Sequence, residues 1–477
     1  MQNRRIAASL CSLALVAGFT CAGTSSPVAD AAQPTKKVKP TKKPKAPKNV
    51  IVLIGDGMGY NQIAAASLYQ KGRSYKQAVG QEGAVREVKG KPVNLQERWP
   101  VQVDMATYSV KGSYDPLRAW RDFDYVKADP TDSAAAGTAM STGVKTYNAG
   151  LGVDPEGKPV ENLSERAIAL GKAAGSISSV QFSHATPASY VVHNKSRNDY
   201  LGIANQEVAS KMTVMMGAGN PRFDDNGKLL KTPKYGYISE TDYKGLQQGT
   251  KGWKLVESKS DFQKLTKGKT PKRVFGIAEV ATTLQQSRDG ESEQPYDVPL
   301  NKNVPDLATM TKGALNVLDN DPDGFTLMVE GGAIDWAGHG NQGARNIEET
   351  IDFNKAVAAV NQWVEKNSSW DETLVIVTAD HETGYLSGAV SDPNWTLLRG
   401  TKGRLPQHAW HSGDHTNQLV PVYAKGVGSK QLAARAVAGD PVRGKYLDNT
   451  DLANVLLKDL WANKSQAMSA KGKPAKR

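Results

Sequence analysis

The stretch NVIVLIGDGMG, residues 49–59, decides the fold. Its apolar run is continuous rather than alternating, and no charged residue interrupts it before Asp56. Strands of this composition are buried on both faces, as they are in parallel sheets. Three later stretches have the same form: SISSVQFSHAT from Ser176, FTLMVEGGAID from Phe325 and TLVIVTADHETG from Thr373. The chain therefore contains four predicted buried strands, each followed by Gly, Asp or His.

Helical patterns lie between these strands. The segment NIEETIDFNKAVAAVNQWVEKN, residues 346–367, places Ile351, Val357, Val360 and Val364 on one face. Alternating strands and helices predict an α/β protein with a mostly parallel central sheet and helices on both faces.

We expect a single domain over residues 49–463. Residues 222–300 are richer in Gly, Lys and Tyr and less periodic. They are interpreted as a loop-rich insertion in the same domain.

Residues 1–31 have the form of a signal peptide. Arg4 and Arg5 precede an apolar run, and Ala29–Ala31 offers a small-x-small cleavage site. A membrane anchor is the alternative, but Ser, Thr and Gly interrupt the run and no second apolar stretch follows. We therefore expect a secreted protein in the extracellular space, the cell wall or the periplasm. Sec and twin-arginine export both remain open.

The two cysteines, Cys11 and Cys21, lie inside this segment. Lipid modification of Cys21 is an alternative for which FTC is a poor site. Cleavage after Ala31 leaves a chain without cysteine, so disulfides are excluded. Any metal site in the mature chain must then use oxygen and imidazole ligands.

The net charge of +12 is concentrated at the ends of the chain. Residues 1–31 carry +1, the Lys/Pro-rich linker at 32–48 has seven lysines, and the basic tail at 464–477 has five positive residues. The rest therefore has a net charge of −1, which does not indicate a nucleic-acid-binding face. The linker is typical of an extended spacer. Contact with anionic cell-wall polymers or lipid headgroups is one hypothesis, and a purely solubilising role is the other.

Polar side chains gather where the predicted strands end. Ligands bind beyond the carboxyl ends of the strands in open α/β sheets. The residues expected at that edge are Asp56, Thr186, Glu330, Asp335, His339, Asp380 and His381. One acidic residue after a strand is usually a turn or helix cap, but the repetition, with two histidines added, favours a shared site.

The types of these residues indicate metal binding. Asp335 and His339 are four residues apart, on one face of a helical turn. Imidazole with carboxylate suits zinc, whereas carboxylate and hydroxyl oxygens suit magnesium. Two kinds of site are therefore predicted. The late stretch HAWHSGDHTN adds His408, His411 and His415, among which spacing does not choose.

The stretch DPTDSAAAGTAMSTG, residues 129–143, contains a candidate nucleophile. Ser133 would lie in the first turn of a helix of small residues, where N–H groups and the helix dipole favour negative charge. The alternative is that Ser133 only caps this helix. A serine hydroxyl needs a base or a metal to become a good nucleophile. The residues together predict a metal-dependent hydrolase with a serine nucleophile.

The sequence resembles the alkaline phosphatase family, in particular the secreted bacterial enzymes. The motifs occur in the family's order and span nearly the whole mature chain. They are GDGMG (55–59), TDSAAAGTAMSTGVKTYNAGLGVD (131–154), HATPASYVVHNKSR (184–197), VEGGAID (329–335), TADHETG (378–384) and DHTN (414–417). The related sulfatases carry a formylglycine precursor motif that is absent here.

The resemblance implies two zinc ions and one magnesium ion. The residues implied for the first zinc are Asp335, His339 and His415; for the second, Asp56, Asp380 and His381; and for magnesium, Asp56, Thr186 and Glu330. It thus selects His415 among the late histidines. His408 and His411 are then expected to face solvent or support the ligands, and His193 has no assigned role.

The resemblance also implies how phosphate is held. Ser133 would become phosphoserine, Arg197 would grip two phosphate oxygens, and Asp132 would orient Arg197. Two residues near the substrate depart from one well-known bacterial pattern. His184 replaces an aspartate, which should weaken magnesium and admit zinc or cobalt. Trp336 replaces a lysine, which predicts weaker binding of product phosphate.

The implied function is an exported phosphomonoesterase that releases inorganic phosphate from small phosphate monoesters at alkaline pH, for phosphate scavenging. Homodimers are common in the family. A phosphodiesterase or sulfatase is the rival within the superfamily, although Arg197 favours a monoester because a diester has fewer free oxygens. A wall-associated binding protein with an inactive site is the rival from another class.

Overall fold

The computed structural model describes residues 45–462. The predicted signal peptide at 1–31, the linker up to residue 44 and the basic tail at 464–477 lie outside the described residues.

The centre of the fold is an eleven-stranded sheet. From one edge to the other, its strands are β16 (Ala438–Asp440), β17 (Gly444–Asp448), β4 (Val101–Ala106), β15 (Val420–Gly426), β10 (Thr373–Thr378), β1 (Asn49–Gly55), β9 (Phe325–Gly331), β5 (Ala173–Gln181), β6 (Val214–Ala218), β8 (Val274–Ile277) and β7 (Lys254–Val256). The seven strands from β10 to β7 are parallel to one another. Strand β15 runs antiparallel to both neighbours, and β16 is antiparallel to β17. The predicted mostly parallel sheet is confirmed.

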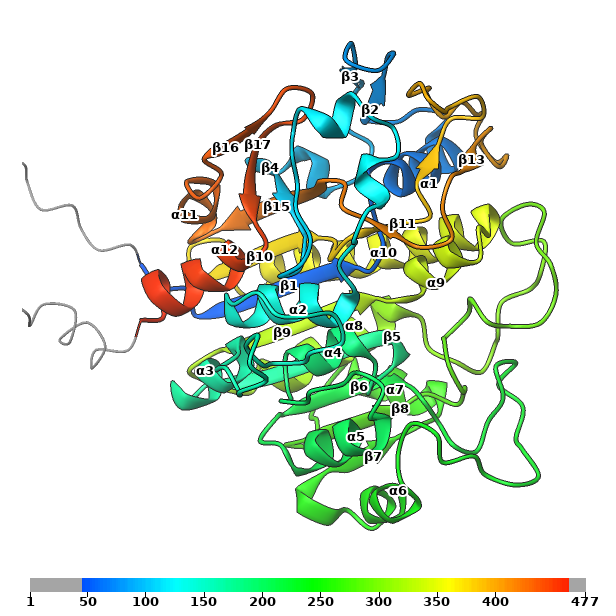
Figure 1. Ribbon diagram of the computed structural model, residues 1–477. Helices are drawn as coiled ribbons and strands as arrows, with labels where there is room; N and C mark the ends of the chain where they lie inside the picture. The colour runs from blue at the N-terminus through cyan, green and yellow to red at the C-terminus, as the bar shows by residue number, and fades with distance from the viewer. Residues whose placement is uncertain (1–44, 463–477) are drawn as a thin grey trace, which may run out of the picture. The chain divides into compact units, whose positions relative to one another are not determined.

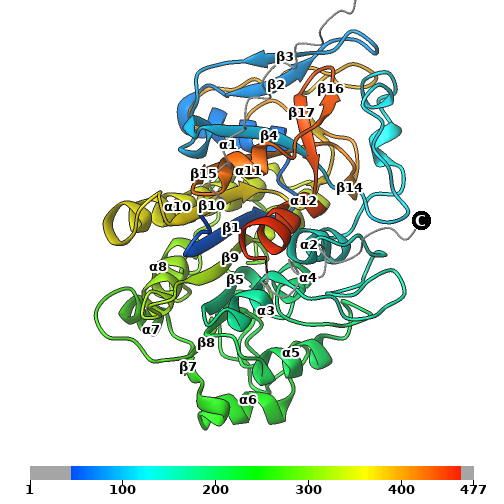
Figure 2. The same cartoon turned by 90° about the vertical axis from the view of Figure 1, so that its left-hand side faces the viewer.

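Helices cover both faces of this sheet (Figures 1 and 2). In Figure 2, α7 (Lys259–Leu265), α8 (Leu307–Leu318) and α10 (Gly343–Asn367) lie to one side of the strands. Helices α2 (Ser133–Thr142), α4 (Ala185–Ser189) and α5 (Tyr200–Ala209) lie to the other. The remaining helices are α1 (Tyr60–Lys71), α3 (Leu163–Ala169), α6 (Glu240–Gln247), α9 (Ala333–His339), α11 (Ser429–Ala433) and α12 (Thr450–Asn454). The predicted layered α/β fold is confirmed.

The four apolar stretches form the strands at the centre of the sheet. Every residue of β1, β5, β9 and β10 is buried, because helices on both faces exclude water from them. In α10, the predicted face packs inward, with Val357, Val360 and Val364 at 0% exposure. Strand composition and helix periodicity therefore reflect the same layered core.

Residues 222–300 combine loops with short strands and helices. They contain α6, α7 and the edge strands β7 and β8, and β8 pairs in parallel with β6. Small pairs complete the structure: β2 (Lys76–Val79) with β3 (Arg86–Lys89), β11 (Glu382–Thr383) with β14 (His415–Thr416), and β12 (Leu386–Ser387) with β13 (Ala409–Trp410).

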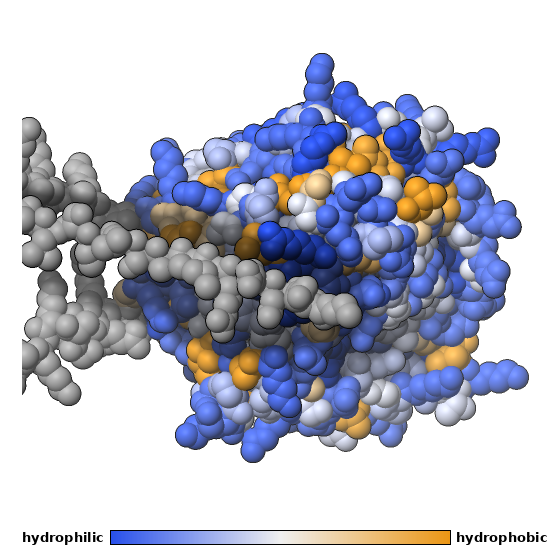
Figure 3. Space-filling model, turned by 45° about the horizontal axis from the view of Figure 1, so that its top comes forward, coloured by the Kyte–Doolittle hydropathy of each residue, from blue (hydrophilic) through white to orange (hydrophobic). Residues whose placement is uncertain are grey.

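The surface in Figure 3 is mainly hydrophilic, with small separate hydrophobic areas. The most exposed large apolar side chains are Val437 at 85%, Val390 at 78% and Leu229 at 62%. Across residues 45–462, no helix combines the length and apolarity needed to cross a membrane.

The carboxyl group of Glu207 is buried without a hydrogen-bond partner among the described residues. Glu207 on α5 is 0% exposed, and neither carboxylate oxygen has a hydrogen-bond partner within the described residues. It lies between Ala204 and Val208, which belong to an apolar cluster. Burial raises the pKa of Glu207 well above its ordinary value.

Glu207→Gln should therefore stabilise the protein in a pH-dependent way. When the pKa of an acid is higher in the folded chain than in the unfolded chain, the free energy of unfolding falls as pH rises above the unfolded pKa. The unfolded chain then releases a proton that the folded chain keeps bound. Urea unfolding should show a gain on the order of 1 kcal/mol at pH 8 that shrinks toward pH 4. Glu240→Gln, at a half-exposed side chain, is the matched control. An equal gain at both pH values would contradict the interpretation.

Candidate functional site

Four neighbouring strands place polar side chains at their carboxyl ends, on one side of the sheet. In the order β10, β1, β9, β5, these are adjacent parallel strands. Asp56 directly follows β1, Glu330 is the penultimate residue of β9, and Asp380 and His381 follow β10. Thr186 lies in α4, shortly after β5. The structure thus brings the predicted strand-end residues together.

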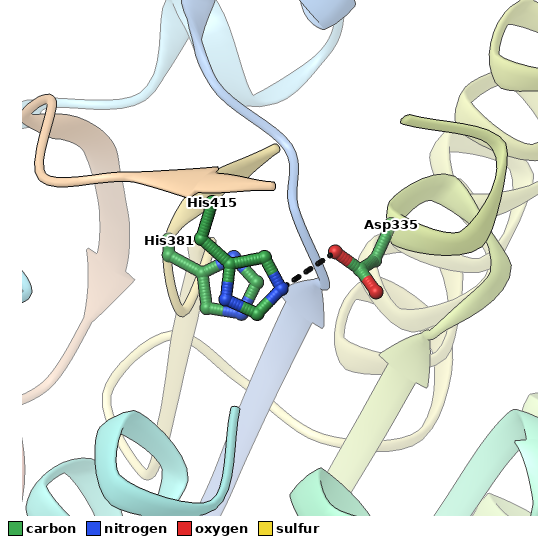
Figure 4. Close-up of side chains that lie close together, drawn as sticks. All are labelled: Asp335, His381 and His415. Carbon is green, nitrogen blue, oxygen red and sulfur yellow. Dashed lines mark ion pairs between the residues drawn. The ribbon is translucent and has the colours of Figure 1, made fainter. Parts of the chain in front are cut away.

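A turn of helix and a short strand pair supply the remaining predicted ligands. Asp335 and His339 lie on α9, immediately after β9. His415 lies on β14, directly opposite Thr383 of β11. This pairing stacks the rings of His381 and His415, with centroids 3.6 Å apart and planes 20° apart. Figure 4 shows the two rings side by side, with His415 directed toward Asp335.

Hydrogen bonds orient the outer histidines. His339 Nδ1 lies 2.8 Å from the carbonyl oxygen of Gly413, and His415 Nδ1 lies 2.8 Å from that of Thr131. Carbonyls accept, so each Nδ1 carries a proton, and in the neutral ring each Nε2 then presents a lone pair. The two Nε2 atoms are 2.9 Å apart. Two facing lone pairs suit a cation that both nitrogens bind.

Asp335 completes this pair of histidines. Its Oδ1 lies 3.3 Å from His415 Nε2, and its Oδ2 lies 3.4 Å from His339 Nε2. Although burial opposes the effect, the hydrogen bond and charge of His415 lower the pKa of Asp335. The two imidazoles and this carboxylate are the donor set that zinc prefers.

Ser133 lies at the first position of α2, pointing at the centre of the site. Its side chain is buried, and its Oγ is 3.2 Å from His381 Nε2. The N-cap of α2 is Asp132, whose Oδ1 accepts the N–H of Ala135 at 2.9 Å. The alternative that Ser133 caps this helix is therefore wrong. Its hydroxyl is available for another role.

The small residues of α2 allow close helix packing. A Cβ on Gly137 would lie 2.4 Å from the hydroxyl oxygen of Ser189 on α4. Because α4 also carries Thr186, a bulkier α2 would push these two site elements apart. Gly57, at φ +69°, has a similar role, since its Cβ would lie 2.8 Å from the Cα of Asp335.

Buried carboxylates surround His381. Its Nε2 lies 3.2 Å from Asp380 Oδ2 and 3.4 Å from Asp56 Oδ1. Neither oxygen has a hydrogen-bond partner within the described residues. Burial and then the charge of Asp335 raise the pKa of Asp380 to about 7, and burial and then Asp380 raise that of Asp56. A cation at this position would stabilise both carboxylates in their ionised form, so the donor set fits one.

A third group lies deeper. Ligand atoms of Asp56, His184 and Glu330 lie within 4.8 Å of one another, and Thr186 donates to Asp56 at 3.3 Å. Glu330 also accepts a hydrogen bond from Ser178, and its other oxygen has no partner within the described residues. Burial and the charge of Arg197 lower the pKa of His184 to about 3. His184 is therefore neutral.

Arg197 extends from a loop toward the same region. It donates to Asp132 Oδ2 at 3.0 Å and lies 3.2 Å from His184 Nε2. Asp132 Oδ2 also accepts the N–H of Ala149 at 2.9 Å, which fixes the carboxylate. Trp336 packs edge-on against His184, with ring centroids 5.8 Å apart. The predicted substrate residues thus form one connected group.

The other three histidines contact residues outside the groups of candidate ligands. His193 bridges Glu165 at 2.8 Å and the Gly152 carbonyl at 2.6 Å. His411 packs edge-on against Phe123, and His408 against Trp410.

Sequence reasoning missed two residues. Thr383 donates to Asp335 and lies 3.2 Å from His381 Nδ1, so its hydroxyl connects two candidate ligands. Its position in the quoted stretch TADHETG was the available signal. Asp414 forms a group with His339 and His415. Its place directly before His415 could have indicated it.

Comparisons with known proteins give one consistent result. The sequence model of the family described as Alkaline phosphatase matches residues 47–403. Alkaline phosphatase 4 of Bacillus subtilis (strain 168) is 30% identical, over 91% of this chain and 93% of its own length. Alkaline phosphatase of Escherichia coli (strain K12) is 32% identical, over 71% of this chain and 70% of its own. The alkaline phosphatase structure from the Antarctic bacterium TAB5 shares the fold, with a TM-score of 0.60 and 24% identity over 88% of this chain and 100% of its own.

Proposed function

The chain belongs to the alkaline phosphatase family, and from this premise we propose that it hydrolyses phosphate monoesters through a phosphoserine formed on Ser133. The observation that supports this most directly is the position of the serine. Its Oγ lies 3.2 Å from His381 Nε2, where the buried carboxylates of Asp56 and Asp380 converge.

The groups of ligands would hold three divalent ions. We assign two zinc ions to the histidine-containing pair of sites and magnesium to the deeper one. The residues are Asp335, His339 and His415; Asp56, Asp380 and His381; and Asp56, Thr186 and Glu330. When bound, such ions lower the pKa of oxygen nucleophiles and neutralise charge on the attacking and leaving oxygens. Because His184 lies at the deeper site, zinc or cobalt is an alternative there.

The reaction then needs little covalent help from other side chains. The Ser133 hydroxyl loses its proton, and its oxygen attacks phosphorus while the alcohol oxygen leaves on the opposite side and gains a proton. Water next attacks the phosphoserine, which releases inorganic phosphate and restores the hydroxyl. The N-terminus of α2 favours the negative charge gathered there. Positioning dominates phosphoryl transfer.

Arg197 and its neighbours would orient the phosphate. A guanidinium can donate two parallel hydrogen bonds to non-bridging oxygens. Asp132 positions this guanidinium from the helix that also carries Ser133. Trp336 brings no positive charge, so product phosphate should leave more readily than with a lysine there.

Export is part of the proposal. The predicted signal peptide at 1–31 supports secretion for phosphate scavenging, and the lysines of residues 32–48 support contact with anionic wall or membrane surfaces. A homodimer is proposed from the family alone.

Relative rates on monoester and diester substrates test the substrate class. The protein should hydrolyse p-nitrophenyl phosphate far faster than bis-p-nitrophenyl phosphate, because a monoester has three non-bridging oxygens, two for Arg197 and one for a bound cation, whereas a diester has only two to share between them. Arg197→Ala should lower kcat/KM for the monoester by about 10²–10³-fold, as expected for two charge-assisted hydrogen bonds. The diester rate should fall much less. A wild-type preference for the diester, or equal losses on both substrates, would count against a monoesterase.

A further inference from the structure

The groups of candidate metal ligands form a row that runs from solvent to the core. Within residues 45–462, four groups of three side chains have ligand atoms within 4.8 Å of one another. From outside inward they are His339, Asp414 and His415; Asp335, His381 and His415; Asp56, Asp380 and His381; and Asp56, His184 and Glu330. Consecutive groups share one side chain. Only the outermost group has exposed members.

Asp414 is held in place at the outer end of this row. Its Oδ1 accepts the N–H of His415 at 2.7 Å, and its own carbonyl accepts the N–H of Gly384 at 3.0 Å. Its side chain is exposed, and the His339 side chain is 38% exposed. A hydrated cation can therefore reach both residues from solvent.

The histidine pair has a carboxylate on each side. Asp335 contacts both rings from the buried side, at 3.3 and 3.4 Å. Asp414 joins the same pair from the exposed side. The two carboxylates fall in separate ligand groups, so they define an inner and an outer position for a cation.

We propose that Asp414 is a loading ligand, which with His339 and His415 binds a divalent cation at the surface and transfers it inward to Asp335. The inference rests on the proposed metal-dependent function. A cation must exchange water for protein ligands before it enters a buried site. An outer carboxylate lets this exchange occur in two steps. Because it lowers the barrier in both directions, it speeds uptake and release without changing the equilibrium.

The test measures zinc exchange rather than turnover. Full-length protein is stripped of metal, its metal content is determined, and Zn²⁺ uptake is followed by stopped flow with a chromogenic chelator. Release from the loaded protein is followed with excess chelator, and the Zn²⁺ Kd is obtained by competition. Asp414→Asn keeps an oxygen that can accept from the His415 N–H. It should slow uptake and release alike by about tenfold, with Kd nearly unchanged.

Two controls separate ligation from charge. Asp414→Glu keeps the carboxylate and should exchange zinc faster than Asp414→Asn. Asp122→Asn removes an exposed carboxylate that accepts the N–H of Asp124 at 3.0 Å, and it should exchange zinc like the wild type. Unchanged rates in Asp414→Asn, equal slowing in Asp122→Asn, or a weaker Kd with faster release would overturn the inference. Failure of the wild-type protein to take up zinc would overturn the proposed function as well.

Discussion

Ser133→Ala should reduce turnover of p-nitrophenyl phosphate by on the order of 10⁴-fold or more, the scale seen when a catalytic nucleophile is removed. The hydroxyl lies beside His381, and alanine leaves no oxygen for phosphorus to bind. Binding of inorganic phosphate should persist, because Arg197 and the candidate metal ligands remain. Steady-state rates and phosphate binding by calorimetry measure the two effects separately. If the protein were a binding protein with an inactive site, the wild type itself would show no turnover.

The covalent step can be observed directly. Acid quenching during turnover of ³²P-labelled monoester should trap label on the wild-type chain and none on Ser133→Ala. Ser141→Ala is the matched control, because Ser141 is a buried hydroxyl on the same helix that donates to the Ser189 carbonyl at 2.8 Å. It should keep the label. Label on the Ser133→Ala chain, or residual turnover close to wild type, would contradict the phosphoserine mechanism.

The fold could be predicted from the sequence because burial on both faces leaves a strong local signal. The apolar run before Asp56 forms β1, and helical periodicity around Val357 identified the buried face of α10. The edge strands β7 and β8 were harder to predict. They have three and four residues, and their pairing depends on contacts distant in sequence. Short strands carry little periodicity, so only the assembled sheet reveals them.

Residue types indicated the site, but its detailed organisation depended on tertiary contacts. Polar residues after successive strands were expected to meet, and the topology of four adjacent parallel strands brings them together. Whether Ser133 caps α2 could not be decided from spacing, since Ser and Asp both favour N-caps and Asp132 directly precedes Ser133. The roles of Thr383 and Asp414 depend on the two-residue strand that holds His415. A pairing this short has no sequence signature.

Removing divalent ions should abolish turnover and also destabilise the fold. Asp56, Asp380 and Glu330 are each 0% exposed, and each has an oxygen with no partner among the described residues. Burial raises the pKa of Glu330 to about 7, as it does for Asp380. Bound cations would stabilise these carboxylates in the folded chain only, so chelation should lower Tm by several degrees.

The measurement combines metal content per chain, turnover and thermal unfolding, before and after dialysis against a chelator. Turnover should fall by on the order of 10³-fold or more and return with Zn²⁺ and Mg²⁺. Asp380→Asn removes one of the buried charges, so chelation should lower its Tm less than that of the wild type. Glu240→Gln changes a half-exposed side chain that is not a candidate ligand, so chelation should lower its Tm as much as that of the wild type. Full turnover with far less than one zinc per chain would contradict a metal-activated serine. Among the described residues, His381 would then remain as the base within hydrogen-bond distance of the Ser133 hydroxyl.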